Sequence, residues 1–342
     1  MRKIALLGVG AMGSLFAGRL APYADVSMIG HWPAQLAALQ TAGVRLYRAD
    51  GRDTVQRVLV TNDVRAVGQV EVVLVLVKSY QTEQAARQAG QLLSPRGVVV
   101  TLQNGVGNLA RITAVVGADR ATLGVTAQGA MLMAPGVVRD TGAGPIHVAL
   151  PAQAAPIMAN GLQLLVDLLR QADFTVHVVT EADSLLWGKL AVNAGLNPLT
   201  ALLRVPNGFV AEHEPARTVL WRAATETAAV AQAQGIALPY AHAGQHVLEV
   251  ARATAVNHSS MLQDIQRGAP TEIEAICGAV VRAGEAHGVA TPVNALLYRL
   301  VTMVERGEAA TIGAWGTQLA DADTLHLFHA LLAQANMAQR QG

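Results

Sequence analysis

The chain begins with a glycine-rich turn between an apolar strand and a helix, and this feature restricts its fold more than any other. Residues 3–7 predict a short buried strand, residues 11–20 predict a helix, and the segment GVGAMG joins the two. In such a turn the first glycine permits the tight bend, the second lets the backbone approach a pyrophosphate, and the third lets the helix pack close to the strand. Because unpaired amides at a helix N-terminus attract anions, this arrangement predicts a dinucleotide-binding site. The predicted contacts are Gly8, Val9, Gly10, Ala11, Met12 and Gly13.

The same segment admits two other interpretations. Met1-Arg2-Lys3 before an apolar stretch is similar to a secretory signal, and a glycine-rich turn can also exist without a ligand. Glycines at positions 8, 10 and 13 weaken a signal helix, and the periodic pattern continues beyond Arg19 without a cleavage signal. We therefore expect a strand, a turn and a helix that bind a dinucleotide.

Length, charge and cysteine content exclude several classes of protein. A chain of 342 residues with 52% hydrophobic residues is long enough for two packed domains. The balance of 25 Lys and Arg against 24 Asp and Glu argues against a nucleic-acid-binding protein. The longest apolar run, residues 72–77, is far shorter than the roughly 20 residues of a membrane span. Cys277 is the only cysteine, which excludes an internal disulfide and indicates a reducing, cytoplasmic location.

Strand and helix signals alternate through the first half of the chain, as a doubly wound α/β sheet requires. Residues 70–77, VEVVLVLV, are almost continuously apolar, which predicts a parallel strand covered on both faces. Lys78 follows this strand directly, and Asn104 follows the strand predicted at residues 97–102. Ligands of open α/β sheets bind at the carboxyl ends of strands, so both residues are candidate contacts, although a solvated lysine explains Lys78 equally well.

The remaining pattern predicts two domains of different class. Further elements are a strand at 26–29, short strands within 125–150 joined by a Gly/Pro-rich hairpin at 140–145, a helix at 156–171 and a strand at 175–179. Beyond residue 180 the strand signals stop and helical periodicity continues to about residue 335. We predict a Rossmann-type doubly wound domain over residues 1–180 and an all-helical domain over residues 181–342, with about ten frayed residues at the end.

The second domain opens with three polar residues spaced four apart in KLAVNAGLNPLTAL, namely Lys189, Asn193 and Asn197. This spacing stacks them on one face of a helix. A lysine and two amides on a stripe of Ala, Leu and Val are costly to bury unless they hold something polar. A helix cap before Pro198 would account for Asn197 alone. Together the three suit a carbonyl oxygen or oxyanion, because the lysine can donate a proton and the amides can fix orientation.

A second polar cluster occurs in the segments NHSSMLQD and TEIE. Ser259 and Ser260 are adjacent hydroxyls near a predicted helix start, where they can hold a carboxylate. Thr271 and Glu274 have the spacing of a capping box, which leaves Glu272 free to point elsewhere. The ten histidines show no metal-ligand spacing.

Four segments together make the chain resemble the ketopantoate reductase (2-dehydropantoate 2-reductase) family over essentially its full length. They are GVGAMG, QNGVGN, KLAVNAGLNPLTAL with the PNG that follows it, and SSMLQDIQRGAPTEIEAICG. The resemblance implies a dinucleotide-binding domain joined to a helical domain. It also implies NADPH-dependent reduction of 2-dehydropantoate to (R)-pantoate, a step toward pantothenate and coenzyme A.

The resemblance further implies roles for the matching positions. Lys189 would be the catalytic acid, and Glu272, also catalytic, would approach both cofactor and substrate. The substrate contacts would be Asn104, Lys189, Asn193, Asn197, Asn207, Asn257, Ser259 and Ser260. The cofactor contacts would be residues 8–13, His31, Lys78, Asn104, Ala130 and Glu272.

One departure from the family concerns the 2′-phosphate of NADPH. Where the family often has an arginine after the second strand, this chain has Gly30-His31-Trp32. It also lacks the Asp or Glu that binds the ribose diol of NAD at this position. We expect NADPH, with Lys78 and His31 supplying positive potential, and NADH stays open as an alternative.

The expected mechanism is hydride transfer from the nicotinamide C4 to the C2 ketone, with proton donation by Lys189. The expected partner is a small 2-oxoacid rather than nucleic acid or a membrane, and the protein is expected to be a monomer or homodimer. Two alternatives stay open. One is a reductase or dehydrogenase for another 2-oxoacid or D-2-hydroxyacid on the same scaffold. The other is a non-catalytic NADP-binding regulator, against which the presence of Lys189 and Glu272 argues.

Overall fold

The computed structural model describes residues 1–307, which divide into two compact units. Unit 1 consists of Met1–Gln103 and Gly107–Ala182, and unit 2 combines Asn104–Val106 with the chain from Asp183 onward. The frayed tail and the last part of the helical pattern predicted from the sequence lie outside the described residues. Within residues 1–307 no helix is long and apolar enough to cross a membrane.

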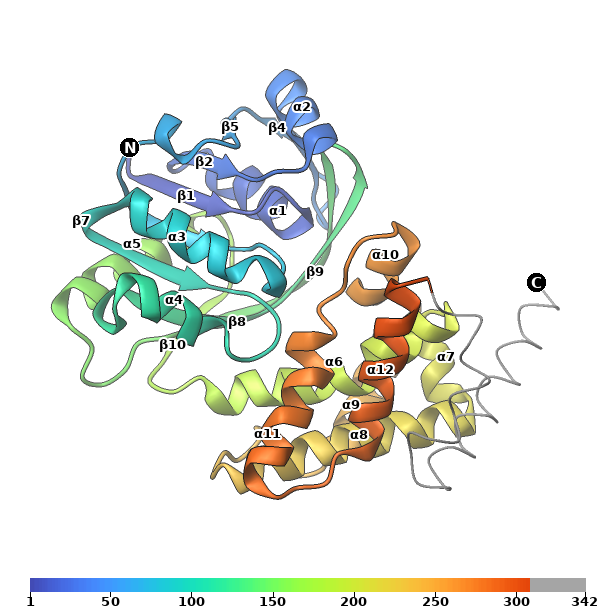
Figure 1. The fold of residues 1–342 in the computed structure, drawn as a ribbon. Coiled ribbons are helices and arrows are strands. Elements are labelled where there is room, and N and C mark those ends of the chain that lie inside the picture. The colour runs from blue at the N-terminus through green and yellow to red at the C-terminus, as the bar shows by residue number, and fades with distance from the viewer. Residues whose placement is uncertain (308–342) are drawn as a thin grey trace. The chain divides into compact units, whose positions relative to one another are not determined.

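Unit 1 is built on a ten-stranded, mostly parallel sheet (Figure 1). The strands are β1 (Lys3–Leu7), β2 (Asp25–Ile29), β3 (Val44–Tyr47), β4 (Asp53–Gln56), β5 (Leu59–Thr61), β6 (Val70–Val75), β7 (Leu93–Thr101), β8 (Ala121–Ala134), β9 (Val137–Ala149) and β10 (Val176–Val179). Its helices are α1 (Ala11–Leu20), α2 (Pro33–Ala42), α3 (Thr82–Leu92), α4 (Asn108–Val116) and α5 (Pro156–Gln171). The order β5-β2-β1-β6-β7-β8 is parallel throughout. It is the doubly wound order of a Rossmann sheet, so the predicted fold class is confirmed.

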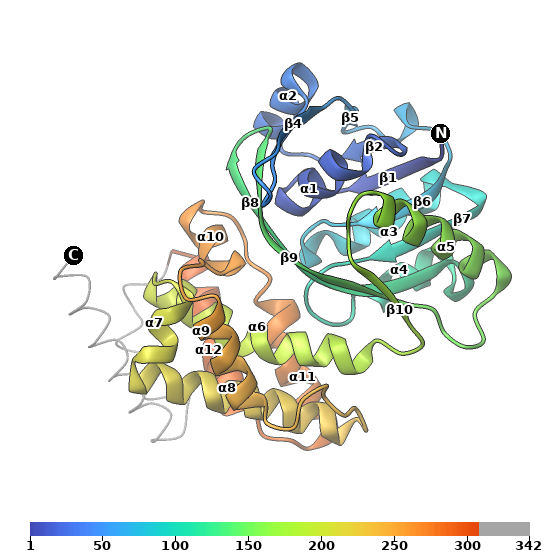
Figure 2. The same cartoon turned by 180° about the vertical axis from the view of Figure 1, so that it is seen from behind.

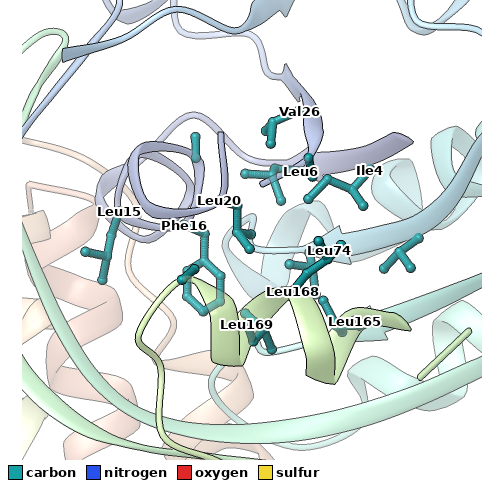
Figure 3. Close-up of a cluster of buried hydrophobic side chains, with 14 of the residues drawn as sticks. Ile4, Leu6, Leu15, Phe16, Leu20, Val26, Leu74, Leu165, Leu168 and Leu169 are labelled. Carbon is teal, nitrogen blue, oxygen red and sulfur yellow. The ribbon is translucent and has the colours of Figure 1, made fainter. Parts of the chain in front are cut away.

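The central strands are buried on both faces, which explains their nearly unbroken apolar sequence. Ile4 and Leu6 of β1 belong to the hydrophobic cluster that includes α1 and α5, which Figure 3 shows. Ala5 and Leu7 of the same strand belong to a second cluster with α3 and α4. Each fully buried leucine contributes roughly 1.5–3 kcal/mol relative to an exposed one. This two-sided burial fixes β1 and therefore the glycine turn that follows it.

The hairpin predicted at residues 140–145 is wrong. The two long strands β8 and β9 are joined instead at Pro135 and Gly136, and Gly136 has a φ of +78°. Proline followed by glycine is the preferred pair at the centre of a type II turn. The Gly/Pro-rich segment lies within β9, where the register with β8 shifts between Gly129 and Ala130. Its glycines mark an irregular strand rather than a chain reversal.

Unit 2 is helical in the described residues (Figure 2). Its elements are α6 (Asp183–Leu203), α7 (Asn207–Glu212), α8 (Glu214–Ala233), α9 (Ala243–Ala253), α10 (Ser260–Gln266), the π-helix η4 (Glu274–Gly278), α11 (Ala279–His287) and α12 (Pro292–Glu305). Helices α6, α8 and α9 pack against one another around a core of mostly Ala, Val and Leu side chains that also includes Trp187. Gly195 permits this packing, because a Cβ there would lie 3.0 Å from the Leu220 carbonyl oxygen.

Candidate active site

Helix α6 carries the three polar residues predicted to share one face. It is continuous from Asp183 to Leu203, so Lys189, Asn193 and Asn197 occupy successive turns of one helix. Lys189 and Asn193 are partly exposed, whereas Asn197 is buried. The helix therefore presents the Asn193 amide partly at its surface and holds the Asn197 amide in the interior.

Pro198 lies inside α6 and does not end it, so the interpretation of Asn197 as a helix cap is wrong. A proline has no N–H, which leaves the carbonyl of Ala194 without its usual helical donor. The thiol of Cys277 points at this carbonyl oxygen, with the sulfur 3.9 Å away. Burial raises the pKa of Cys277. The cysteine therefore stays a neutral thiol and supports the helix where the proline interrupts its hydrogen bonding.

Lys189 lies in an environment that weakens its proton affinity. Burial lowers the pKa of its ammonium group from 10.5 to about 8, while the negative charge of Glu272 acts in the opposite direction. Glu272 is only 5% exposed. A lysine with a pKa near 8 is mostly protonated at neutral pH and can still release its proton to a reacting oxygen.

The strand-end segment Asn104–Val106 joins Glu272 in unit 2. The Asn104 side-chain amide donates a 3.0 Å hydrogen bond to a Glu272 carboxylate oxygen. The Val106 N–H bonds to the Ala275 carbonyl at 3.3 Å. Gly105 has a φ of +80°, and a Cβ there would lie 2.3 Å from the Ala275 carbonyl oxygen. Only glycine permits the backbone at position 105 to lie this close to Ala275. This close packing lets the preceding residue, Asn104, reach the Glu272 carboxylate with its side-chain amide.

The π-helix η4 sets the position of Glu272. The Ala275 and Ile276 amides both bond to the Glu272 carbonyl, and the Gly278 amide bonds to the Ile273 carbonyl in the π pattern. The hydroxyl of Thr271 accepts the Ile273 N–H at 3.1 Å. Short π segments occur often at functional sites, where they redirect a side chain.

The predicted capping box does not form. Thr271 caps the Ile273 amide, and the carboxylate of Glu274 instead binds Arg282 and Tyr298. These contacts tie η4 to α11 and α12. The Glu272 carboxylate instead accepts the Asn104 amide, so the two glutamates have different partners.

Of the two adjacent serines, Ser259 lies in the interior and Ser260 lies at the surface. Ser259 is buried, caps α10 through the Leu262 amide at 3.1 Å, and shares a 2.7 Å hydrogen bond with the Thr200 hydroxyl of α6. Ser260 and Asn257 are exposed. The sequence pattern did not predict a role for Thr200, although this residue lies three positions after Asn197 and therefore near the same face of α6.

Asn207 starts α7 and is buried. Its side-chain amide donates to the Thr254 hydroxyl at 2.9 Å, and its backbone N–H bonds to the Asn257 carbonyl at 2.9 Å. Its side-chain oxygen has no hydrogen-bond partner among the described residues. Asn207 thus joins α7 to the segment after α9, and its buried side-chain oxygen is an acceptor that no described residue uses.

In unit 1 the three glycines of the turn differ in the space around them. A Cβ on Gly8 would lie 2.9 Å from the Leu76 backbone, and a Cβ on Gly13 would lie 1.9 Å from the Gly8 carbonyl oxygen. A Cβ on Gly10 would meet no atom within 4 Å. Gly8 and Gly13 are therefore needed for chain packing, whereas Gly10 leaves open space at the start of α1.

The other residues of the glycine turn are partly or fully buried. Val9 is buried, and its side chain occupies the space where a Cβ on Gly30 would lie. Ala11 and Met12 pack against the cluster of α1 and α5. These three side chains therefore contribute to packing within unit 1.

Three further predicted cofactor residues also belong to unit 1. His31 is exposed after β2, with its Nε2 atom 2.9 Å from the side-chain nitrogen of Gln84 on α3. Lys78 is partly buried after β6, and Ala130 is partly buried on β8. No group of three or more metal-ligating side chains occurs among residues 1–307.

Comparison with known proteins identifies the family. The profile described as ketopantoate reductase PanE/ApbA matches residues 4–153, and the profile of its C-terminal part matches residues 181–305. A 2-dehydropantoate 2-reductase of Halobacterium salinarum is 36% identical over 310 residues, which cover 89% of this chain and 99% of the relative.

Two solved structures are similar over nearly their whole length. A PanE/ApbA family ketopantoate reductase from Ralstonia eutropha has a TM-score of 0.80 and 29% identity, covering 90% of this chain and 99% of that one. A D-mandelate dehydrogenase solved with NADH and anilino(oxo)acetate has a TM-score of 0.80 and 25% identity, with the same coverage. The chain therefore belongs to the ketopantoate reductase family of oxidoreductases.

Proposed function

We propose that this protein reduces 2-dehydropantoate to (R)-pantoate with NADPH, and that Lys189 is the general acid. The observation that carries the proposal is the Lys189, Glu272 and Asn104 cluster of unit 2, in which burial brings the lysine pKa to about 8. A proton donor with this pKa suits reduction of a ketone near neutral pH. The names of the curated relatives support the substrate.

Each residue of the cluster has a distinct task in this mechanism. Lys189 donates its proton to the alkoxide that develops at C2 of the substrate. Glu272 favours the ammonium form of Lys189, because its negative charge raises the lysine pKa. The Asn104 amide fixes the orientation of Glu272 through their 3.0 Å hydrogen bond. Asn193, partly exposed one turn from Lys189, would orient the substrate from the same helix.

The glycine turn fits a dinucleotide, because Gly10 offers open backbone at the start of α1 while Gly8 and Gly13 are closely packed. Bound reduced nicotinamide would supply the hydride for the C2 ketone. Lys78 and His31 would supply positive potential for the 2′-phosphate of NADPH. The residues after β2, Gly30-His31-Trp32, include no carboxylate that would favour the diol of NADH.

The proposal is tested by following oxidation of NADPH with 2-dehydropantoate for the wild type and Lys189→Ala. We expect the variant to lose about 10²–10⁴-fold in kcat while its affinity for NADP⁺ stays within about twofold. Near-normal turnover in Lys189→Ala would refute the acid role. Equal or better catalytic efficiency with NADH would refute the cofactor assignment.

A second candidate is reduction of another 2-oxoacid on the same scaffold. The similarity to D-mandelate dehydrogenase favours it, because that enzyme was solved with NADH and an oxoacetate ligand. The proton donor and ketone chemistry would be the same, and only the groups around the substrate side chain would differ. Comparing kcat/KM for 2-dehydropantoate and phenylglyoxylate, with each cofactor, separates the two candidates.

A further inference from the structure

We propose that Gln103 and Thr82 are positioning residues for the nicotinamide cofactor. The inference rests on the proposed function, and it concerns two residues that contribute no proton and no charge. Both lie at the carboxyl edge of the unit 1 sheet, where α/β proteins bind dinucleotides. Gln103 is 8% exposed and Thr82 is fully buried.

The Gln103 side chain connects the ends of two neighbouring parallel strands. Its amide nitrogen donates to the Val77 carbonyl at 3.0 Å and to the Thr82 hydroxyl at 2.9 Å. Its amide oxygen accepts the Thr101 hydroxyl at 2.8 Å. Both amide hydrogens and the oxygen therefore have hydrogen-bond partners, which fixes the side chain in one orientation.

Thr82 extends this network to the starts of two helices. It is the first residue of α3, and its hydroxyl lies 2.7 Å from the Ser79 carbonyl and 2.9 Å from the Asn108 side-chain oxygen. Asn108 is the first residue of α4 and is also buried. One hydroxyl thus joins the end of β7, through Gln103, to the loop before α3 and to the start of α4.

The residues held by this network are chain neighbours of two candidate cofactor contacts. Val77 directly precedes Lys78, and Gln103 directly precedes Asn104. A single buried amide therefore holds the backbone from which two candidate contacts emerge. A buried polar network whose members are all paired specifies one arrangement, and losing one partner leaves the others unsatisfied. We expect such a loss to displace both loops and weaken cofactor binding.

The test compares two buried threonines. Thr82→Val removes the network hydroxyl at nearly constant shape, and Thr82→Ser keeps it. Thr227→Val is the matched control, because Thr227 is equally buried and, among the described residues, its hydroxyl bonds to the Ala223 carbonyl within its own helix α8. The probe is NADP⁺, titrated by calorimetry, and each variant's thermal midpoint is measured alongside.

We expect Thr82→Val to raise the Kd of NADP⁺ about tenfold and the KM of NADPH in parallel. Thr82→Ser should remain within about twofold of wild type, and Thr227→Val should lower the thermal midpoint without changing the Kd. Thr101→Val, which removes the donor to the Gln103 oxygen from a strand that valine suits, should give a smaller rise in the same direction. It serves as the measurement should Thr82→Val fail to fold.

The inference is overturned if the folded network variants bind NADP⁺ as the wild type does. In that case a wild type that binds NADP⁺ and reduces 2-dehydropantoate keeps the proposed function intact. A wild type that neither binds NADP⁺ nor oxidises NADPH overturns the proposed function and the positioning role together.

Discussion

The depressed pKa of Lys189 predicts that stability and catalysis respond to alkaline pH in opposite directions. A fall from 10.5 to about 8 corresponds to about 3 kcal/mol, at about 1.4 kcal/mol per pH unit. Between these two values the unfolded chain binds more protons at this site than the folded protein does. The free energy of unfolding therefore rises with pH in this window because of Lys189. Reduction, which needs the ammonium form, should decline over the same window.

Lys189→Met isolates this effect, because the variant has no titrating group at the position. Urea unfolding can be followed by tryptophan fluorescence, since Trp187 is buried two residues away. The wild-type free energy of unfolding minus that of Lys189→Met should rise by about 2 kcal/mol between about pH 8 and about pH 10. Taking a difference between variants cancels titrations that both proteins share.

Lys189→Arg is the control, because arginine keeps its charge throughout this range. Its free energy of unfolding minus that of Lys189→Met should stay flat. A flat or falling curve for the wild type would show that folding does not lower the lysine pKa. The argument that the Lys189 pKa suits proton donation near neutral pH would then fail.

Two further predictions concern Glu272 and the loop that contacts its segment. Glu272→Gln removes the negative charge that raises the Lys189 pKa. The alkaline limb of the pH profile of kcat/KM should therefore move below about pH 8. An unmoved limb would contradict the effect of Glu272 on the Lys189 pKa. Gly105→Ala places a Cβ 2.3 Å from the Ala275 carbonyl oxygen and should lower kcat/KM by about 10²-fold. Gly107→Ala has a similar φ of +88° but open space around the Cβ, so it should share the backbone strain and spare most of the activity.

Local signals explain why much of unit 1 could be predicted from the sequence. The strand at residues 3–7 and the helices at 11–20 and 156–171 have the predicted bounds, because periodicity and neighbouring turn residues define them. The β8–β9 turn was misplaced although its signal is local. Pro135 and Gly136 are a strong turn pair, but the nearby segment 140–145, with two glycines and a proline, competes with them.

For the candidate site, too, the features set by neighbouring residues could be predicted from the sequence, and the contacts between distant segments could not. The common helix of Lys189, Asn193 and Asn197 follows from spacing alone, and α6 confirms it. The capping role of Ser259 depends on α10 starting at the next residue. Its contact with Thr200 joins positions 59 residues apart, which no periodicity can reveal.

The hydrogen bond between Asn104 and Glu272 brings residues from two separate sequence motifs into one candidate site. The two residues are 168 positions apart, and each lies in a segment that contacts the backbone of Ala275. Gly105 is needed because Ala275 is close, and Glu272 is aimed by the π-helix that contains Ala275. Ala275 therefore contacts both segments: its carbonyl oxygen lies beside Gly105, and its N–H bonds to the Glu272 backbone carbonyl. Because the charge of Glu272 opposes the effect of burial on Lys189, this shared contact connects the loop to the acidity of the proton donor.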